Sequence, residues 1–175
     1  MNHSTSELHR PVMLERCLEL LRPALSGGNP VVIDCTLGLG GHTEALLLEH
    51  PTLRVIGIDR DPKAIELASR RLEQFGDRFI PAFGVYDEID EILRDLSIDF
   101  VDGILMDLGV SSMQLDLAER GFSYAQEAEL DMRMDQTRGK TAADLLATLS
   151  EEELTRIFRK YGEERFSGPI ARKIV

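Results

Sequence analysis

The chain has 175 residues, of which 43% are hydrophobic, and a formal net charge of −11. This length and apolar content suit one globular domain and leave no room for two full ones. No run of roughly 18 or more apolar residues is present, so we expect no membrane-spanning helix. The polar segment 1–10 lacks the apolar core of a signal peptide.

The chain contains two cysteines, Cys17 and Cys35, both in apolar stretches typical of buried positions. There is no Cys-x-x-Cys motif and no cluster of His and Cys, so the sequence predicts neither a disulfide framework nor a metal site. We therefore expect a reduced, cytoplasmic protein.

The charges are unevenly distributed. Acidic residues concentrate in 87–107, whereas a basic group lies near the C-terminus, at Arg156, Arg159, Lys160, Arg165, Arg172 and Lys173. Nucleic-acid binding normally appears as a basic patch or stripe. The net charge thus argues against tight, non-specific RNA binding but is compatible with a local basic face.

The apolar pattern predicts strands alternating with helices, which is typical of a parallel sheet with crossover helices. In chain order we expect helix 11–21, strand 31–33, helix 41–49, strand 54–58, helix 62–75, strand 79–83, helix 87–96 and strand 101–106. Pro11 suits the start of the first helix, and Asp61-Pro62 supplies an N-cap and first-turn proline for the third.

After the fourth strand the alternation stops. Helices are expected at 141–149, at 154–161 behind a capping box of Ser150 and Glu153, and from Pro169 onward. This order predicts a Rossmann-like half followed by a helical insertion.

The loop after the first strand is typical of a nucleotide-binding site. Gly38 and Gly40 let the backbone turn sharply and approach a ligand closely, and the following helix directs its N-terminus at the same space. Asp59 ends the second strand, 21 residues after Gly38, where a carboxylate can accept hydrogen bonds from both ribose hydroxyls.

NAD is a competing ligand for this loop. The dinucleotide fingerprint requires a third glycine, and Thr43 occupies that position. Asp34, which opens the loop, suits a cofactor with a free amine, such as AdoMet. Tyr86, after the third strand, either lies along an adenine face or covers the sheet edge.

The segment after the fourth strand is the most specific part of the sequence. It reads Asp-Leu-Gly-Val-Ser-Ser at 107–112 and Leu-Asp-Met-Arg-Met-Asp at 130–135. With His-Arg-Pro at 9–11, Gly-Ile-Asp-Arg-Asp-Pro at 57–62 and Tyr-Gly-Glu-Glu-Arg at 161–165, these strings resemble the RsmH (MraW) family of AdoMet-dependent methyltransferases. Two positions depart from the family pattern: Arg16, where many members carry an acid, and Tyr86, where a Phe is expected.

The resemblance implies an α/β, Rossmann-like class I AdoMet-dependent methyltransferase, of which this chain holds the first four strands and the helical insertion after strand four. It implies methylation of N4 of a cytidine in 16S ribosomal RNA, near the decoding centre of the small ribosomal subunit. The residues implied to contact AdoMet are Gly40, Gly41, His42, Asp59, Tyr86, Asp107 and Gln114.

Two roles stay open for Asp107. Amino-methyltransferases of DNA carry an Asp-Pro-Pro-Tyr-like motif at the end of strand four; here Asp107 is present but the stacking aromatic is not. Asp107 is therefore either catalytic, polarising the amine, or a cofactor ligand, and we favour the second role. Phe122 or Tyr124 either holds the flipped base or packs the loop.

The same loop contains two arginines and two methionines with open roles. Met132 and Met134 are expected to pack beneath it as apolar side chains. Arg120 and Arg133 either reach phosphates or pair with a nearby carboxylate, the candidates being Asp116, Asp131 and Asp135.

We expect residues 1–109 to form the N-terminal part of the AdoMet-binding domain, and 110–175 an incomplete loop and helical insertion that recognises substrate. The fourth strand should be central in the family's sheet but here becomes an edge. We therefore expect a truncated chain with little or no activity alone, its edge covered by the missing C-terminal part, a swapped partner or a second copy in a homodimer. The alternative functions are an NAD-binding Rossmann domain and a non-catalytic fragment.

Overall fold

The computed structural model describes residues 11–125 and 127–175. The chain forms two compact units whose boundary falls between Ser111 and Ser112, and each unit is described by itself. No helix in the described residues has both the length and the hydropathy that crossing a membrane requires.

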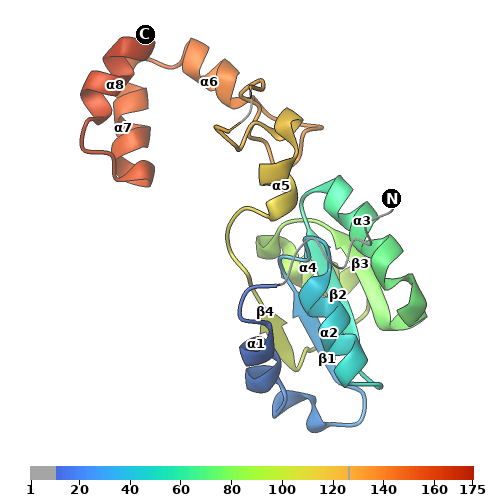
Figure 1. Ribbon diagram of the computed structural model, residues 1–175. Helices are drawn as coiled ribbons and strands as arrows, with labels where there is room; N and C mark the ends of the chain where they lie inside the picture. The colour runs from blue at the N-terminus through green and yellow to red at the C-terminus, as the bar shows by residue number, and fades with distance from the viewer. Residues whose placement is uncertain (1–10, 126) are drawn as a thin grey trace. The chain divides into compact units, whose positions relative to one another are not determined.

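The first unit is built on a parallel sheet of four strands in the order β3-β2-β1-β4 (Figure 1). The strands are β1 Val31–Asp34, β2 Arg54–Asp59, β3 Phe79–Phe83 and β4 Gly103–Leu105. The helices are α1 Leu14–Leu21, α2 Gly41–Glu49, α3 Pro62–Leu72 and α4 Ile89–Asp95. This arrangement confirms the predicted α/β class with a Rossmann-like sheet.

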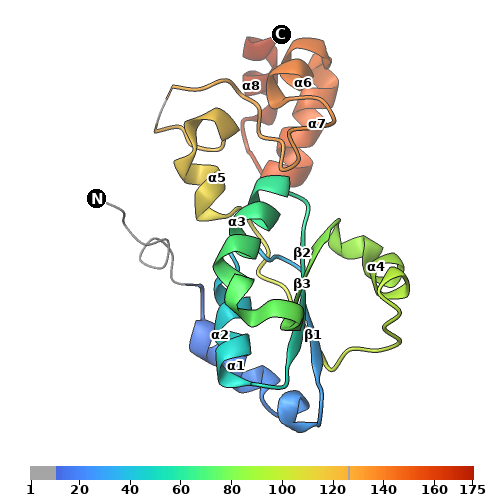
Figure 2. The ribbon, with the colours of Figure 1, turned by 90° about the vertical axis from the view of Figure 1, so that its right-hand side faces the viewer.

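The sheet is covered on both faces, as Figure 2 shows in its edge-on view, with α1, α2 and α3 on one side and α4 on the other. Strand residues alternate between the two layers. Val32 and Val55 pack in the cluster that contains Leu46 and Leu72, whereas Ile33 belongs to the cluster on the other face. Each of these five side chains is fully buried, and burial of one such side chain stabilises a fold by about 1.5–3 kcal/mol.

In the first unit, α1 and α3 show the clearest departures from the predicted helix bounds. The first helix begins at Leu14 rather than at Pro11, because Met13 adopts a left-handed conformation (φ 52°) that cannot continue a helix. The α3 start is confirmed, since the Asp61 side chain accepts a hydrogen bond from the Lys63 N–H. That helix ends at Leu72 and continues as 3₁₀ turns to Arg78, interrupted where Gly76 has a φ of 54°.

Strand β4 lies at an edge of this sheet, as predicted. It is shorter than the predicted 101–106, because Asp102 turns back onto β1: its carboxylate accepts from the Val31 N–H at 2.8 Å. Ile104 and Met106 stay about half exposed. An edge of this kind presents backbone groups and apolar side chains to a further chain segment.

The second unit contains α5 Ser112–Asp116, α6 Ala142–Thr148, α7 Glu151–Gly162 and α8 Ser167–Ile174. The predicted capping box of Ser150 and Glu153 is present at the start of α7, so that helix begins three residues before the predicted 154. The helices α7 and α8 pack side by side as a hairpin (Figure 1), around buried Leu154 and Ala171.

Arg120 cross-links the irregular loop that precedes α6. Its guanidinium donates to the carbonyl oxygens of Arg133 at 3.0 Å and Met134 at 2.7 Å, and the residue is 3% exposed. The alternative that Arg120 reaches a phosphate is therefore wrong, because its guanidinium is buried on the loop's own carbonyls.

Arg133 does pair with a carboxylate, which was one of its two predicted roles. Its guanidinium donates to both oxygens of Asp131, at 2.9 and 2.7 Å, and this pairing lowers the pKa of Asp131 to about 2. The predicted apolar packing is wrong for Met132, which is about half exposed. Met134 is half-buried, and its sulfur accepts a hydrogen bond from Gln114.

We predict that Gly57→Ala destabilises the first unit by about 1–3 kcal/mol, since overpacking forces neighbours to move. A Cβ at Gly57 would lie 2.7 Å from Leu37 Cδ1 and 2.9 Å from Phe79 Cε2. Chemical denaturation measures the loss. Gly27→Ala is the matched control, because a Cβ there meets no atom within 4 Å. Equal stability of the two variants would contradict the packing argument.

We predict that Arg120→Met loosens the loop that contains Arg133 and Met134, because the carbonyls of these two residues lose their shared donor. The unfolding transition of the first unit should not change. Limited proteolysis should cut within 117–140 several-fold faster. Arg165→Met, at an exposed position of the same unit, serves as control. An unchanged cleavage rate would show that Arg120 is not what holds the loop.

Candidate functional site

The loop between β1 and α2 is closed by the carboxylate of Asp34. One oxygen accepts from the Thr36 N–H at 3.2 Å and the other from the Thr43 hydroxyl at 2.8 Å. Asp34 is 1% exposed, and burial raises the pKa of its carboxyl. The structure thus gives Asp34 a role within the loop, and its contact with a cofactor amine stays a prediction.

Thr43 occupies the position where a dinucleotide fingerprint has its third glycine. Its side chain is completely buried, and the hydroxyl is the one that binds Asp34. Glycine at this position serves close packing of helix on strand. Here a threonine fits instead, because its polar atom is satisfied by the strand-end carboxylate.

Two glycines at the start of α2 are required for different physical reasons. Gly40 is the N-cap residue with a φ of 75°, and a Cβ on it would lie 3.0 Å from Leu72 Cδ1. A Cβ on Gly41 would lie 2.5 Å from Pro11 Cγ. The absence of a side chain at Gly40 therefore lets the loop turn against α3. The absence of a side chain at Gly41 lets Pro11, before α1, pack against the start of α2. The first N–H groups of α2 lie at this turn, where helix N-termini favour anions and acceptors.

The side chain of His42 is engaged within the protein. Its Nε2 lies 3.0 Å from the carbonyl oxygen of Val12, so Nε2 carries the hydrogen, and the residue is 6% exposed. This bond ties the segment before α1 to the start of α2. The backbone N–H of His42, in the first turn of α2, is one of the groups that helix pairing leaves open to a ligand.

Asp59 connects the ends of β1 and β2. One carboxylate oxygen accepts from the Gly38 N–H at 2.8 Å, and the other accepts from the Asp61 N–H at 2.9 Å. An ionised carboxylate has about four acceptor positions, so these bonds leave acceptor capacity on both oxygens. Asp59 is half-buried, and burial raises the pKa of its carboxyl.

The ends of β3 and β4 contribute Tyr86 and Asp107. Tyr86 begins a 3₁₀ turn after β3 and is 47% exposed, while the Gly84 N–H beside it donates to the carbonyl of Asp59 at 3.1 Å. The backbone N–H of Asp107 donates to the hydroxyl of Thr36 at 2.7 Å, and its side chain is exposed. The carboxyl ends of all four strands thus lie along one edge of the sheet, its carboxyl-terminal edge, where open α/β sheets bind ligands. This edge is distinct from the lateral edge formed by β4.

The structure brings six of the seven predicted site residues to this edge: Gly40, Gly41, His42, Asp59, Tyr86 and Asp107. Gln114 belongs to the second unit, where it is 5% exposed and its amide nitrogen donates to the sulfur of Met134 at 2.9 Å. Its contact with the cofactor stays a prediction.

Three residues that were not among the seven implied AdoMet contacts shape the site, and of these Gly38 was already predicted as a loop glycine. Thr36 joins the β1 loop to the β4 end, Gly38 donates to Asp59, and Val12 holds His42. The Asp-x-Thr-x-Gly spacing was the available signal for Thr36 and Gly38. No sequence pattern marks Val12, because its contribution is a backbone carbonyl delivered by tertiary contact.

The two aromatic residues that were expected either to hold the flipped base or to pack the loop differ in exposure. Tyr124 is fully exposed, which contradicts the alternative that it packs the loop, whereas Phe122 is half-buried. Among the described residues, no group of three or more His, Cys, Asp or Glu side chains is arranged to hold a metal ion.

Comparison with known proteins identifies relatives over nearly the whole chain. It is 58% identical over 168 residues to the ribosomal RNA small subunit methyltransferase H of Beutenbergia cavernae, a match that covers 96% of this chain and 50% of that protein. The corresponding protein of Pseudarthrobacter chlorophenolicus is 56% identical over 176 residues, covering 98% and 53%. That of Thermobifida fusca is 56% identical over 172 residues, covering 98% and 52%.

The chain therefore spans about half the length of the curated relatives it matches. The sequence profile of the MraW methylase family matches residues 6–175, which include every strand and helix described above. By this match, and by the identity to its relatives, the chain belongs to the MraW methylase family.

Proposed function

We propose that this chain is the cofactor-binding part of an AdoMet-dependent methyltransferase that modifies N4 of a cytidine in 16S ribosomal RNA. The observation that carries the proposal is the carboxylate of Asp59, held at the ligand-binding edge by the N–H groups of Gly38 and Asp61. The family match and the relatives' names, which specify ribosomal RNA of the small subunit, support the reaction class and the RNA substrate.

The residues at the strand ends fit AdoMet. The loop glycines Gly38 and Gly40 have φ of 52° and 75°, and the nearest atom to a Cβ on Gly38 would be 3.8 Å away, so a ligand can approach the backbone there. Asp59 offers acceptors to a ribose diol. The half-exposed ring of Tyr86 offers an apolar face to a base.

We assign contacts with AdoMet to the start of α2 and to the strand ends of the first unit, and we keep the contact of Gln114 as implied by the family. Asp59 would hold the ribose, Tyr86 the adenine, and the α2 backbone the polar end of the cofactor. The full proposed set is Gly40, Gly41, His42, Asp59, Tyr86, Asp107 and Gln114.

AdoMet, when bound, supplies a methyl group on a sulfonium. The exocyclic amine of cytosine is a weak nucleophile because its lone pair is delocalised, so transfer depends on alignment. The exposed carboxylate of Asp107 follows β4 on a backbone fixed by Thr36. We assign Asp107 to the cofactor; its other available role is to accept a hydrogen bond from the target amine.

Strand β4 lies at the edge of the sheet, and Ile104 and Met106 are about half exposed beside it. The curated relatives are about twice as long as this chain. We propose that these 175 residues bind AdoMet and that the apolar edge at β4 is covered when the whole protein carries out methyl transfer.

We predict that Asp59→Asn weakens AdoMet binding about 10- to 100-fold, because hydrogen bonds to a charged acceptor contribute about 1.5–3 kcal/mol each. Isothermal titration calorimetry of the whole chain measures the affinity, with NAD as a second ligand. Asp77→Asn, at an exposed position of the same unit, is the matched control. Unchanged AdoMet affinity, or tighter binding of NAD, would refute the cofactor assignment.

We predict that AdoMet affinity falls on acidification with a midpoint above the usual Asp pKa of about 3.9. Burial raises the pKa of Asp59, so its carboxylate takes up a proton at a higher pH than an exposed one and then loses acceptor capacity. A calorimetric pH series checks this. The Asp59→Asn variant should lack that titration; if it shows the same fall, another group is responsible.

A further inference from the structure

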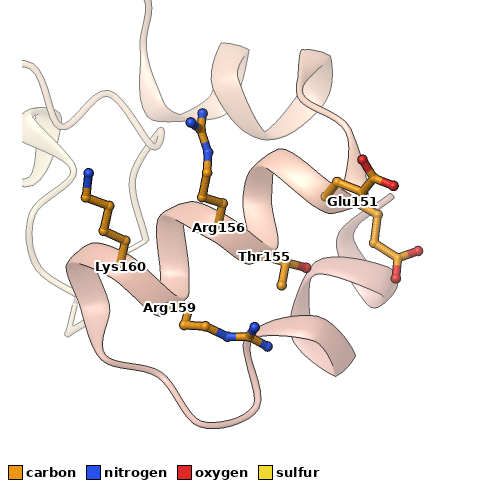
Figure 3. A pocket seen from close by; sticks show the side chains of 6 residues that line it. Glu151, Thr155, Arg156, Arg159 and Lys160 are labelled. Carbon is orange, nitrogen blue, oxygen red and sulfur yellow. The ribbon is translucent and has the colours of Figure 1, made fainter.

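The C-terminal half of α7 forms the basic side of an open cavity of about 400 Å³ (Figure 3). The lining residues all come from α7 and are Glu151, Glu152, Thr155, Arg156, Arg159 and Lys160. The three cations are spaced i, i+3 and i+4, which places them on one face of the helix. Figure 3 shows them along the helix beyond Glu151, so the cavity has an acidic end and a basic end.

These cations are exposed, and their only described carboxylate partner within the unit is Glu153, one turn before Arg156 on the same helix. None of the ion pairs formed within residues 11–125 and 127–175 includes Arg156, Arg159 or Lys160. At the acidic end, Glu151 pairs with Arg172 of α8 at 3.2 Å. In a chain of net charge −11, this leaves a local group of cations able to meet an anionic partner.

Aromatic side chains lie beside the cations. Tyr161 follows Lys160 in the last turn of α7 and is 74% exposed, and the Lys160 ammonium lies 5.2 Å from the centre of its ring. Phe166, in the connection to α8, is 66% exposed. Cations next to exposed rings are the combination that binds single-stranded nucleic acid, through phosphate contacts and base stacking.

We propose that the α7 surface formed by Arg156, Arg159, Lys160 and Tyr161 binds a single-stranded segment of the RNA substrate. The three cations contact successive phosphates, and Tyr161 stacks on an unpaired base. A duplex offers its phosphates but keeps its bases stacked internally, so the exposed ring selects single strands. This inference rests on the proposed function for the class of substrate and adds the surface that holds it.

Basic residues near a helix C-terminus also interact favourably with the helix dipole. That role alone would make their removal lower the stability of α7 without changing RNA affinity. The two explanations therefore separate when unfolding and RNA binding are measured on the same variants.

The phosphate contacts are tested with the whole chain and a short fluorescent RNA of mixed sequence, by anisotropy over a series of salt concentrations. Arg156, Arg159 and Lys160 are replaced together by Gln. For single strands the salt slope changes by about 0.7 per phosphate contact, so the slope should fall by about 2, with at least about ten-fold weaker binding at low salt. The matched control replaces three exposed cations of the first unit, Arg16, Arg54 and Arg94, by Gln.

The stacking contact is tested with Tyr161→Ala and with an abasic oligonucleotide of the same length. The variant should bind the base-bearing RNA about ten-fold more weakly and the abasic strand equally well, since only the former can stack. Tyr161→Phe keeps the ring and should restore binding.

The proposal is overturned if the chain binds no RNA, if the α7 variant binds as tightly as its control, or if duplex RNA binds more tightly than single strands. Thermal unfolding of each variant excludes a folding defect. AdoMet titration on the same samples separates the two proposals. If the chain binds AdoMet but not RNA, only the proposal for the α7 surface is refuted. If it binds RNA through α7 but does not bind AdoMet, only the cofactor assignment is refuted.

Discussion

The carboxylate of Asp59 joins the β1 loop to the turn after β2, and the organisation of the ligand-binding edge depends on this link. It receives the Gly38 N–H from one loop and the Asp61 N–H from the other. Asp61 in turn caps α3 by accepting from Lys63, so a single carboxylate sets the loop that starts α2 and the turn that starts α3. Both oxygens of Asp59 keep acceptor capacity in an orientation that the protein fixes, which supports the proposed contact with a ribose.

The second unit is held together differently. Its irregular loop has few buried apolar side chains, and the buried guanidinium of Arg120 binds two carbonyls within it. Such a loop is stabilised by polar bonds, and its exposed residues, Tyr124 among them, are available to a partner. The hairpin of α7 and α8 packs on Leu154 and Ala171 instead, which leaves the cations of α7 exposed. This distribution explains how a chain of net charge −11 can carry a local basic surface.

The fold and most of the candidate site could be predicted because their signals are local. Short apolar runs placed the four strands, and Asp61-Pro62 and Ser150 with Glu153 placed two helix starts. The parallel order of the strands then brings their carboxyl ends to one edge. Two bounds were missed: Met13 takes a left-handed conformation before α1, and Asp102 ends β4 early by a long-range bond to Val31.

The sequence by itself determined the α/β class, the glycine loop and the carboxylates at the strand ends, because strand periodicity and turn chemistry act over a few residues. Only the tertiary structure decided which distant groups the polar side chains bind. Asp34 faces Thr43, His42 faces the Val12 carbonyl, and Arg120 is buried on the loop's own carbonyls. A side chain's partner depends on which distant backbone groups folding brings within about 3 Å of it, and no local pattern encodes that distance.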